Sequence, residues 1–193
     1  MAATPSVMVP LGTLAPAFEL PDVRGGRVSL DSLADARAVL VAFICNHCPF
    51  VKHIQSELAR LPRDYASMGL AMVGICSNDP VAYPQDNLEA MKIEAASAGW
   101  TFAYLHDADQ SVARAYRATC TPDFFLFDRE RRLAYRGQLD ASRPNNGLPV
   151  TGSDLRRAID AVLKGQKVPG EQAPSIGCNI KWAKGNEPVL APA

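Results

Sequence analysis

The chain has 193 residues, of which 48% are hydrophobic and 21% are charged. This composition favours one folded domain and argues against disorder. Twenty Lys and Arg balance twenty Asp and Glu, so neither nucleic acid nor an anionic membrane surface is expected as a partner. The longest apolar run, Ala38–Cys45, is far shorter than the about 20 residues of a membrane span. Residues 1–10 lack the features of a secretory signal, and we expect a cytoplasmic protein.

Strand and helix patterns alternate over residues 27–164, after a short strand pair around Gly25–Gly26. Together they predict an α/β fold, a three-layer α/β/α sandwich with a mixed central sheet and an N-terminal β-hairpin extension. Pro62 should kink or end the first long helix, and Asp86 and Ser153 should cap later ones. The predicted strands are residues 17–20, 27–30, 38–45, 70–76, 101–105, 124–127 and 133–137, and the predicted helices are residues 51–68, 86–97, 109–116 and 153–164.

The strongest chemical signal is the run Cys45-Asn46-His47-Cys48, placed where a buried strand turns into a helix. Backbone N–H groups and the helix dipole stabilise a thiolate at such a turn. Two intervening residues let the sulfurs approach closely enough to bond, and a Cys-x-x-Cys in this setting predicts a redox pair. We expect Cys45 to be the more exposed thiol with the lower pKa, Cys48 to be the resolving thiol, and His47 to be an accessory positive group.

Two other interpretations of this run remain, a metal site and a pair of inert thiols. Haem attachment is excluded because Pro49, not His, follows Cys48. A metal site using Cys45, Cys48 and His53 stays open as a function from another class, although His53 falls on the polar face of its helix and no second Cys-x-x-Cys exists. The redox interpretation itself requires neither cofactor nor metal.

A second signal is Cys120-Thr121-Pro122, directly before a predicted strand. Proline cannot donate to a strand ladder and is found at a strand's first residue or in a turn. Cys120 is expected near the active site, as a bystander thiol rather than a third redox partner. Cys76, at the end of a buried strand, is expected to be core packing.

These motifs resemble those of thioredoxin-fold redoxins, the group that joins alkyl-hydroperoxide-reductase/thiol-specific-antioxidant (AhpC/TSA) proteins and TlpA-like thiol-disulfide oxidoreductases. Ala15–Asp22 is similar to the family's opening segment, Val41–Cys48 to its active-site strand, and Thr121-Pro122 to its cis-proline loop. The resemblance implies a thioredoxin-like domain over residues 12–164, an N-terminal extension over 1–11 and a packed C-terminal tail over 165–193. It implies a thiol-disulfide oxidoreductase with an antioxidant role, acting with a protein or small-molecule disulfide and a separate reductant.

The resemblance also implies roles for single residues. Cys45 would attack the substrate disulfide, Cys48 would resolve the mixed disulfide, and cis-Pro122 would present the Thr121 backbone to an extended substrate chain. Cys48-Pro49 matches the peroxide-reactive motif of peroxiredoxins, which makes a thiol peroxidase the same-fold alternative. Against it, Val41 replaces the proline of that family, and Thr121-Pro122 stands in the region of its substrate-positioning arginine.

The tail after Gly165 carries one further pattern. Ile176, Cys178, Ile180 and Trp182 alternate with more polar residues, the period of an extended strand. Apolar residues of this kind are rare in a disordered tail. We expect the segment to pack on the domain, with Cys178 either a small apolar filler or an extra redox thiol near the Cys-x-x-Cys.

Overall fold

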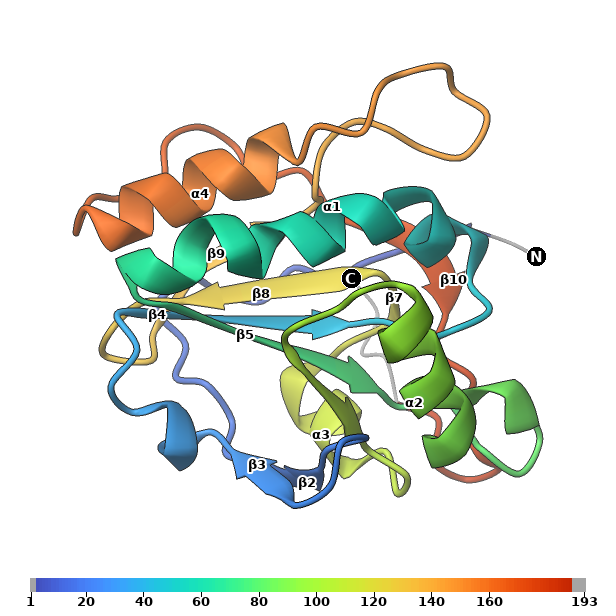
Figure 1. The fold of residues 1–193 in the computed structure, drawn as a ribbon. Coiled ribbons are helices and arrows are strands. Elements are labelled where there is room, and N and C mark those ends of the chain that lie inside the picture. The colour runs from blue at the N-terminus through green and yellow to red at the C-terminus, as the bar shows by residue number, and fades with distance from the viewer. Residues whose placement is uncertain (1–2, 189–193) are drawn as a thin grey trace.

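The computed structural model describes residues 3–188 and is built around one five-stranded mixed sheet (Figure 1). The strands lie in the order β6–β5–β4–β8–β9. β4, β5 and β6 are parallel, whereas β8 runs antiparallel to both β4 and β9. The strand bounds are β4 (Ala38–Phe43), β5 (Leu70–Cys76), β6 (Ala103–His106), β8 (Asp123–Phe127) and β9 (Leu133–Gly137).

Helices cover both faces of this sheet (Figure 1), which confirms the predicted three-layer fold. On one face lie α1 (Pro49–Tyr65), α2 (Leu88–Ser97) and α4 (Ser153–Leu163); on the other lie α3 (Ser111–Tyr116) and the predicted hairpin, β2 (Glu19–Pro21) with β3 (Arg27–Ser29). Three short 3₁₀ turns complete this part of the fold. They are η1 (Asp31–Leu33) before β4, η2 (Ala66–Met68) before β5 and η3 (Pro84–Asp86) before α2.

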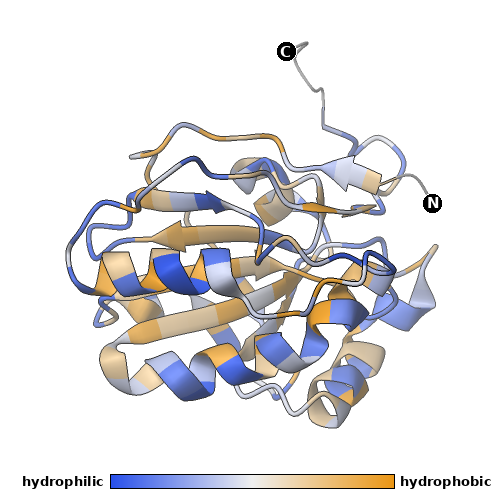
Figure 2. Cartoon of the chain, turned by 90° about the horizontal axis from the view of Figure 1, so that it is seen from above, coloured by the Kyte–Doolittle hydropathy of each residue, from blue (hydrophilic) through white to orange (hydrophobic). Residues whose placement is uncertain are grey.

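The apolar pattern of β4 explains its central position. All six of its residues are buried. Successive side chains point to opposite faces, so Leu40 packs under α1 and α4 while Val41 packs towards α3. Figure 2 shows the same division, with apolar central strands and helices that carry hydrophilic outer faces.

Three predicted boundaries differ from the structure. β4 ends at Phe43 rather than at residue 45, so the Cys-x-x-Cys lies beyond the sheet. Pro62 does not end α1 but lies in its last turn, since the helix continues to Tyr65. The N-cap of α4 is Gly152, not Ser153, and the Leu139 carbonyl accepts the N–H groups of Asp154 and Leu155 in the first turn, at 3.2 and 3.1 Å.

A small second sheet joins the two ends of the described chain. β10 (Ile176–Asn179) lies between β1 (Ala3–Pro5) and β7 (Cys120–Thr121), antiparallel to both. The tail therefore packs as a strand beside the loop that leads into β8.

A buried ion pair anchors that loop. Arg136 of β9 and Asp123 of β8 are both fully buried, and Arg136 Nη2 donates to Asp123 Oδ2 at 3.0 Å. The same carboxylate oxygen accepts the Thr119 N–H at 3.3 Å. The Arg136 guanidinium also lies 3.7 Å from the centre of the Phe125 ring. The pair therefore ties residues 119–123 to the sheet.

We predict that Arg136→Met lowers the free energy of unfolding by about 3–5 kcal/mol, because it leaves the Asp123 carboxylate buried without its partner. The matched variant is Asp123→Asn/Arg136→Met, which removes the buried charge and keeps an acceptor for Thr119. Urea unfolding of both variants measures the effect. A double variant that is no more stable than Arg136→Met would contradict this role of the pair.

Candidate active site

The two cysteines of the Cys-x-x-Cys lie at the junction of β4 and α1. Cys45 is the second residue after β4, and Cys48 is the N-cap residue of α1. The Ile44 N–H still bonds to Ile75 of the neighbouring strand at 2.9 Å, so the first cysteine is held close to the end of the sheet. Both thiols are sealed, with Cys45 1% and Cys48 0% exposed. Exposure therefore does not distinguish Cys45 from Cys48, although Cys45 was expected to be the more exposed thiol.

Residue Thr121 contacts both sulfurs. Its Oγ1 lies 3.4 Å from Cys45 Sγ, and its carbonyl oxygen accepts from Cys48 Sγ at 3.0 Å. The peptide bond to Pro122 is cis. The fold thus brings together the four residues that the two sequence motifs supplied, from segments more than 70 positions apart.

The ionisation of the two thiols is linked. A hydrogen bond from Cys45 lowers the pKa of Cys48 to about 5 against burial, helped by Thr121, Cys178 and the Val51 N–H. The hydrogen bond to Cys48 and burial raise the pKa of Cys45 well above that of a free thiol, and the negative charge of Asp86 adds to this. The Thr121 carbonyl favours protonated Cys48, but the donors around this sulfur outweigh it.

This assignment reverses the expected order of the two pKa values. Cys48 rather than Cys45 occupies the helix N-cap, where backbone N–H groups are unpaired and the helix dipole favours negative charge. The sequence argument applied the helix effect to the first cysteine, but Pro49 begins the helix only after the second. The helix N-terminus therefore acts on Cys48 rather than on Cys45, in the direction that lowers the pKa of Cys48.

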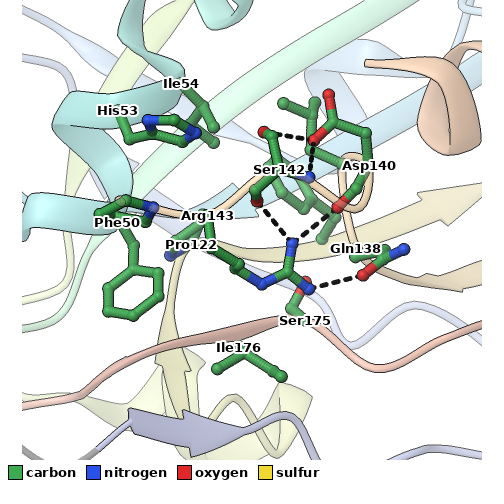
Figure 3. A pocket seen from close by; sticks show the side chains of 13 residues that line it. Phe50, His53, Ile54, Pro122, Gln138, Asp140, Ser142, Arg143, Ser175 and Ile176 are labelled. Atoms are coloured by element: carbon green, nitrogen blue, oxygen red, sulfur yellow. Dashed lines mark hydrogen bonds between the residues drawn. The ribbon is translucent and has the colours of Figure 1, made fainter. Parts of the chain in front are cut away.

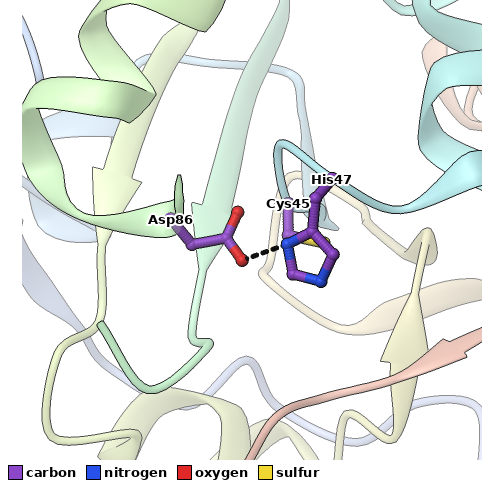
Figure 4. Close-up of side chains that lie close together, drawn as sticks. All are labelled: Cys45, His47 and Asp86. Carbon is purple, nitrogen blue, oxygen red and sulfur yellow. Dashed lines mark ion pairs between the residues drawn. The ribbon is translucent and has the colours of Figure 1, made fainter. Parts of the chain in front are cut away.

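Asp86 contacts both residues of the turn between the cysteines. It is completely buried, and its carboxylate accepts the Asn46 N–H at 2.8 Å and contacts His47 Nδ1 at 2.6 Å (Figure 4). Asn78 donates to the same carboxylate at 2.8 Å. The Tyr104 hydroxyl donates to the Asn46 side chain at 3.0 Å. Asn46 and His47 are thereby fixed beside the sulfur of Cys45.

Sequence reasoning missed Asp86, which it assigned as the N-cap of α2. The N-cap is Asn87, whose side chain accepts the Ala90 N–H at 2.9 Å. Because Asn87 supplies the cap, Asp86 is free to turn inward. Asn78, two residues after β5, was a usable signal: β4 and β5 are parallel, so their carboxyl ends meet at one edge of the sheet.

A metal ion could be held by Cys45, His47 and Asp86. Their ligand atoms lie within 4.8 Å of one another, the one such group of three in residues 3–188. Thiolate, imidazole and carboxylate form a donor set that suits zinc. The set differs from the expected one, because neither Cys48 nor His53 belongs to it.

The remaining three cysteines are all buried, but they differ in how close they lie to the pair. Cys76 and Cys120 are fully buried, and burial raises the pKa of both thiols. Cys120 lies in the loop beside the site, but its sulfur donates towards the Pro122 carbonyl at 3.6 Å. Cys178 of β10 is 3% exposed and within hydrogen-bonding reach of Cys48.

A small pocket opens beside Pro122 and the first turn of α1 (Figure 3). Phe50, His53 and Arg143 are among the residues that line it. Its volume of about 20 Å³ suits a single ordered water. His53 Nε2 and Arg143 Nε are buried and have no hydrogen-bond partner in the protein. A water in this pocket would give them one.

Within residues 3–188, no helix is both long and apolar enough to span a bilayer. A search of curated proteins returned no match. Two solved structures resemble the chain over nearly all of its length: a hypothetical protein from Sinorhizobium meliloti 1021 (56% identity, 94% of this chain and 100% of that one, TM-score 0.93) and an uncharacterized conserved protein from Geobacillus kaustophilus (54% identity, 95% and 98%, TM-score 0.93).

A more distant structure shares the fold. It is a thiol:disulfide interchange protein of the thioredoxin family from Chlorobium tepidum TLS, with 20% identity, 81% of this chain and 99% of that one covered, and a TM-score of 0.61. The model of the AhpC/TSA family matches residues 11–136, which is more than half of the sequence. The chain therefore belongs to the AhpC/TSA family and has the thioredoxin-like fold.

Proposed function

We propose that this protein is a thiol-disulfide oxidoreductase whose redox pair is Cys45 and Cys48. The observation that carries the proposal is the shared environment of the two thiols, which both contact Thr121 and shift each other's pKa in opposite directions. Two inert core thiols need neither a shared polar contact nor a lowered pKa. Cys76 and Cys120 illustrate the inert case, since burial raises the pKa of each.

In the proposed reaction a thiolate attacks one sulfur of a substrate disulfide and forms a mixed disulfide. The other substrate sulfur leaves as a thiolate and takes a proton. The second cysteine then attacks the mixed disulfide, which releases the reduced substrate and leaves Cys45 bonded to Cys48. Because its pKa is the lower of the two, Cys48 is proposed as the attacking sulfur. Cys45 then resolves the mixed disulfide. An external thiol reductant returns the pair to its reduced form.

The burial of both sulfurs constrains the substrate. A protein disulfide reaches them only when a covering segment moves, whereas a small disulfide needs a smaller opening. We propose that both classes are substrates and that the protein acts in the cytoplasm. The antioxidant role follows from the same chemistry, because reduction of disulfides reverses oxidative damage to thiols.

The second candidate function is a thiol peroxidase with Cys48 as the peroxide-reactive group. It is favoured by the low pKa of Cys48 and by its place at the N-cap, immediately before Pro49. Against it, Arg136 is committed to Asp123 and so does not supply a cation to the thiolate. A sulfenic acid on Cys48 would be reduced by Cys45 with loss of water, leaving the same disulfide.

We predict that the reduced protein cleaves the disulfides of insulin in the presence of dithiothreitol, and that Cys45→Ser and Cys48→Ser each abolish this turnover. Cys120→Ser, which alters a buried thiol of the neighbouring loop, should keep it. The same variants are assayed for consumption of hydrogen peroxide. Peroxide consumption that survives Cys45→Ser, together with no insulin cleavage by the wild type, would make the peroxidase the correct function.

We predict that the ultraviolet absorbance of thiolate in the reduced protein rises with pH through an apparent pKa of about 5. Cys48→Ala should remove this step. Cys45→Ala should shift it to higher pH, because the Cys45 thiol is the main donor to the Cys48 thiolate. Cys120→Ala is the control that leaves the step in place. A step that disappears in Cys45→Ala and persists in Cys48→Ala would place the thiolate on Cys45.

Metal analysis separates the redox proposal from a metal-binding function. We predict that the protein, purified under reducing conditions and dialysed against zinc, holds less than one equivalent, and that His47→Ala leaves insulin cleavage within a few-fold of wild type. Stoichiometric zinc that is lost in both His47→Ala and Asp86→Asn would instead support a metal site at Cys45, His47 and Asp86.

A further inference from the structure

The tail strand β10 occupies the edge of Thr121 that an extended substrate would use. Cys178 pairs with Thr121, and Asn179 pairs with Cys120, in antiparallel register. Extended peptides commonly bind by adding a strand to such an edge. Here the chain supplies that strand itself, and the residue directly opposite Thr121 is a cysteine.

Gly177 permits this close approach. A Cβ atom on Gly177 would lie 2.0 Å from the Thr121 carbonyl oxygen and 2.6 Å from its carbonyl carbon. Any other residue would push β10 away from the loop. The tail is held further along by Ile180, whose N–H bonds to Thr119 at 3.1 Å, and by Lys181, whose N–H bonds to the Asn78 side chain at 2.8 Å.

The register aims the thiol of Cys178 at the redox pair. Residues directly opposite in an antiparallel pair place their side chains on the same face. The Thr121 side chain contacts Cys45, so the side chain of Cys178 lies on that same side. Cys45, Cys48 and Cys178 belong to one buried cluster, and Cys48 is close enough to raise the pKa of Cys178. Cys48 is therefore flanked by two thiols.

We propose that Cys178 is a third redox thiol, which exchanges with the Cys45–Cys48 disulfide to form a Cys48–Cys178 disulfide. This inference rests on the proposed function, because that function supplies the oxidised pair. Cys178 sulfur attacks Cys48 sulfur; the Cys48–Cys178 bond forms as the Cys45–Cys48 bond breaks. Cys45 leaves as a thiolate and takes up the proton that Cys178 loses. One disulfide is present before and after, so the step needs no further oxidant.

Oxidation itself makes Cys178 more acidic. In the reduced protein, burial and then the hydrogen bond and charge of Cys48 raise the pKa of Cys178, while the Lys181 ammonium opposes the rise. Once Cys48 is bonded to Cys45 it carries no charge, and both of its contributions vanish. Burial still raises the pKa of Cys178 after the pair is oxidised, but the charge of Cys48 no longer adds to it.

The exchange would also change the site in two ways. It frees Cys45 while the protein remains oxidised, and it links β10 covalently to the start of α1. The tail then cannot leave the Thr121 edge. Access of an extended substrate to that edge would depend on the redox state of Cys178.

Disulfide mapping of the full chain tests the proposal. Wild type, Cys45→Ser, Cys178→Ser and Cys120→Ser are equilibrated in glutathione redox buffers, blocked with an alkylating reagent and digested for mass spectrometry. We expect both disulfides in the wild type and in Cys120→Ser. Cys45→Ser should retain Cys48–Cys178, and Cys178→Ser should retain only Cys45–Cys48. Circular dichroism establishes that each variant is folded, and the wild-type map is decisive without any variant.

The outcomes separate this proposal from the one on which it rests. If Cys45–Cys48 forms in the wild type and Cys48–Cys178 does not, Cys178 does not exchange with the pair and the redox pair stands alone. If neither disulfide forms in any buffer, the redox pair itself fails, and the exchange fails with it.

Discussion

The contact of Thr121 with both sulfurs is the interaction on which the rest of the site depends. Its side chain meets Cys45, its carbonyl meets Cys48, and its backbone pairs with β10. No other described residue links the redox pair, the cis-proline loop and the tail. The position of Thr121 is in turn set by the ion pair between Asp123 and Arg136, which fixes the loop to the sheet. A buried charge pair thus helps to hold the loop that brings Thr121 to the thiols.

The charges and dipoles around the two thiols act on them in opposite directions. Asp86 brings a buried negative charge near Cys45 and disfavours a thiolate there. The helix N-terminus and three donors favour a thiolate on Cys48. The two effects push the pKa values of the pair apart, which assigns different roles to sulfurs that are only three positions apart in the sequence. Unequal pKa values of this kind are typical of groups that work as a pair in catalysis.

The order of the elements followed from the sequence because each central element is strongly patterned. The apolar run of β4 and the amphipathic period of α1 leave few other folds. The Cys-x-x-Cys and Thr121-Pro122 could be recognised for the same reason, as local motifs. Asp86 could not, because its inward turn depends on Asn87 taking the cap. The lower pKa of Cys48 depended on a helix boundary, and boundaries are set by tertiary contacts that a single sequence does not contain. The pairing of Cys178 with Thr121 is likewise a long-range register, although the alternation in the tail did indicate a strand.

The most direct test of the central claim is a redox titration of Cys45 and Cys48. The full chain is equilibrated across a series of glutathione buffers, and the alkylated fraction of each cysteine is measured by mass spectrometry. We predict one two-electron transition in which Cys48 loses its thiol together with a partner, while Cys76 and Cys120 stay reduced throughout. Cys45 and Cys48 that remain fully reduced in every buffer, or that oxidise independently of each other, would contradict the assignment of a redox pair.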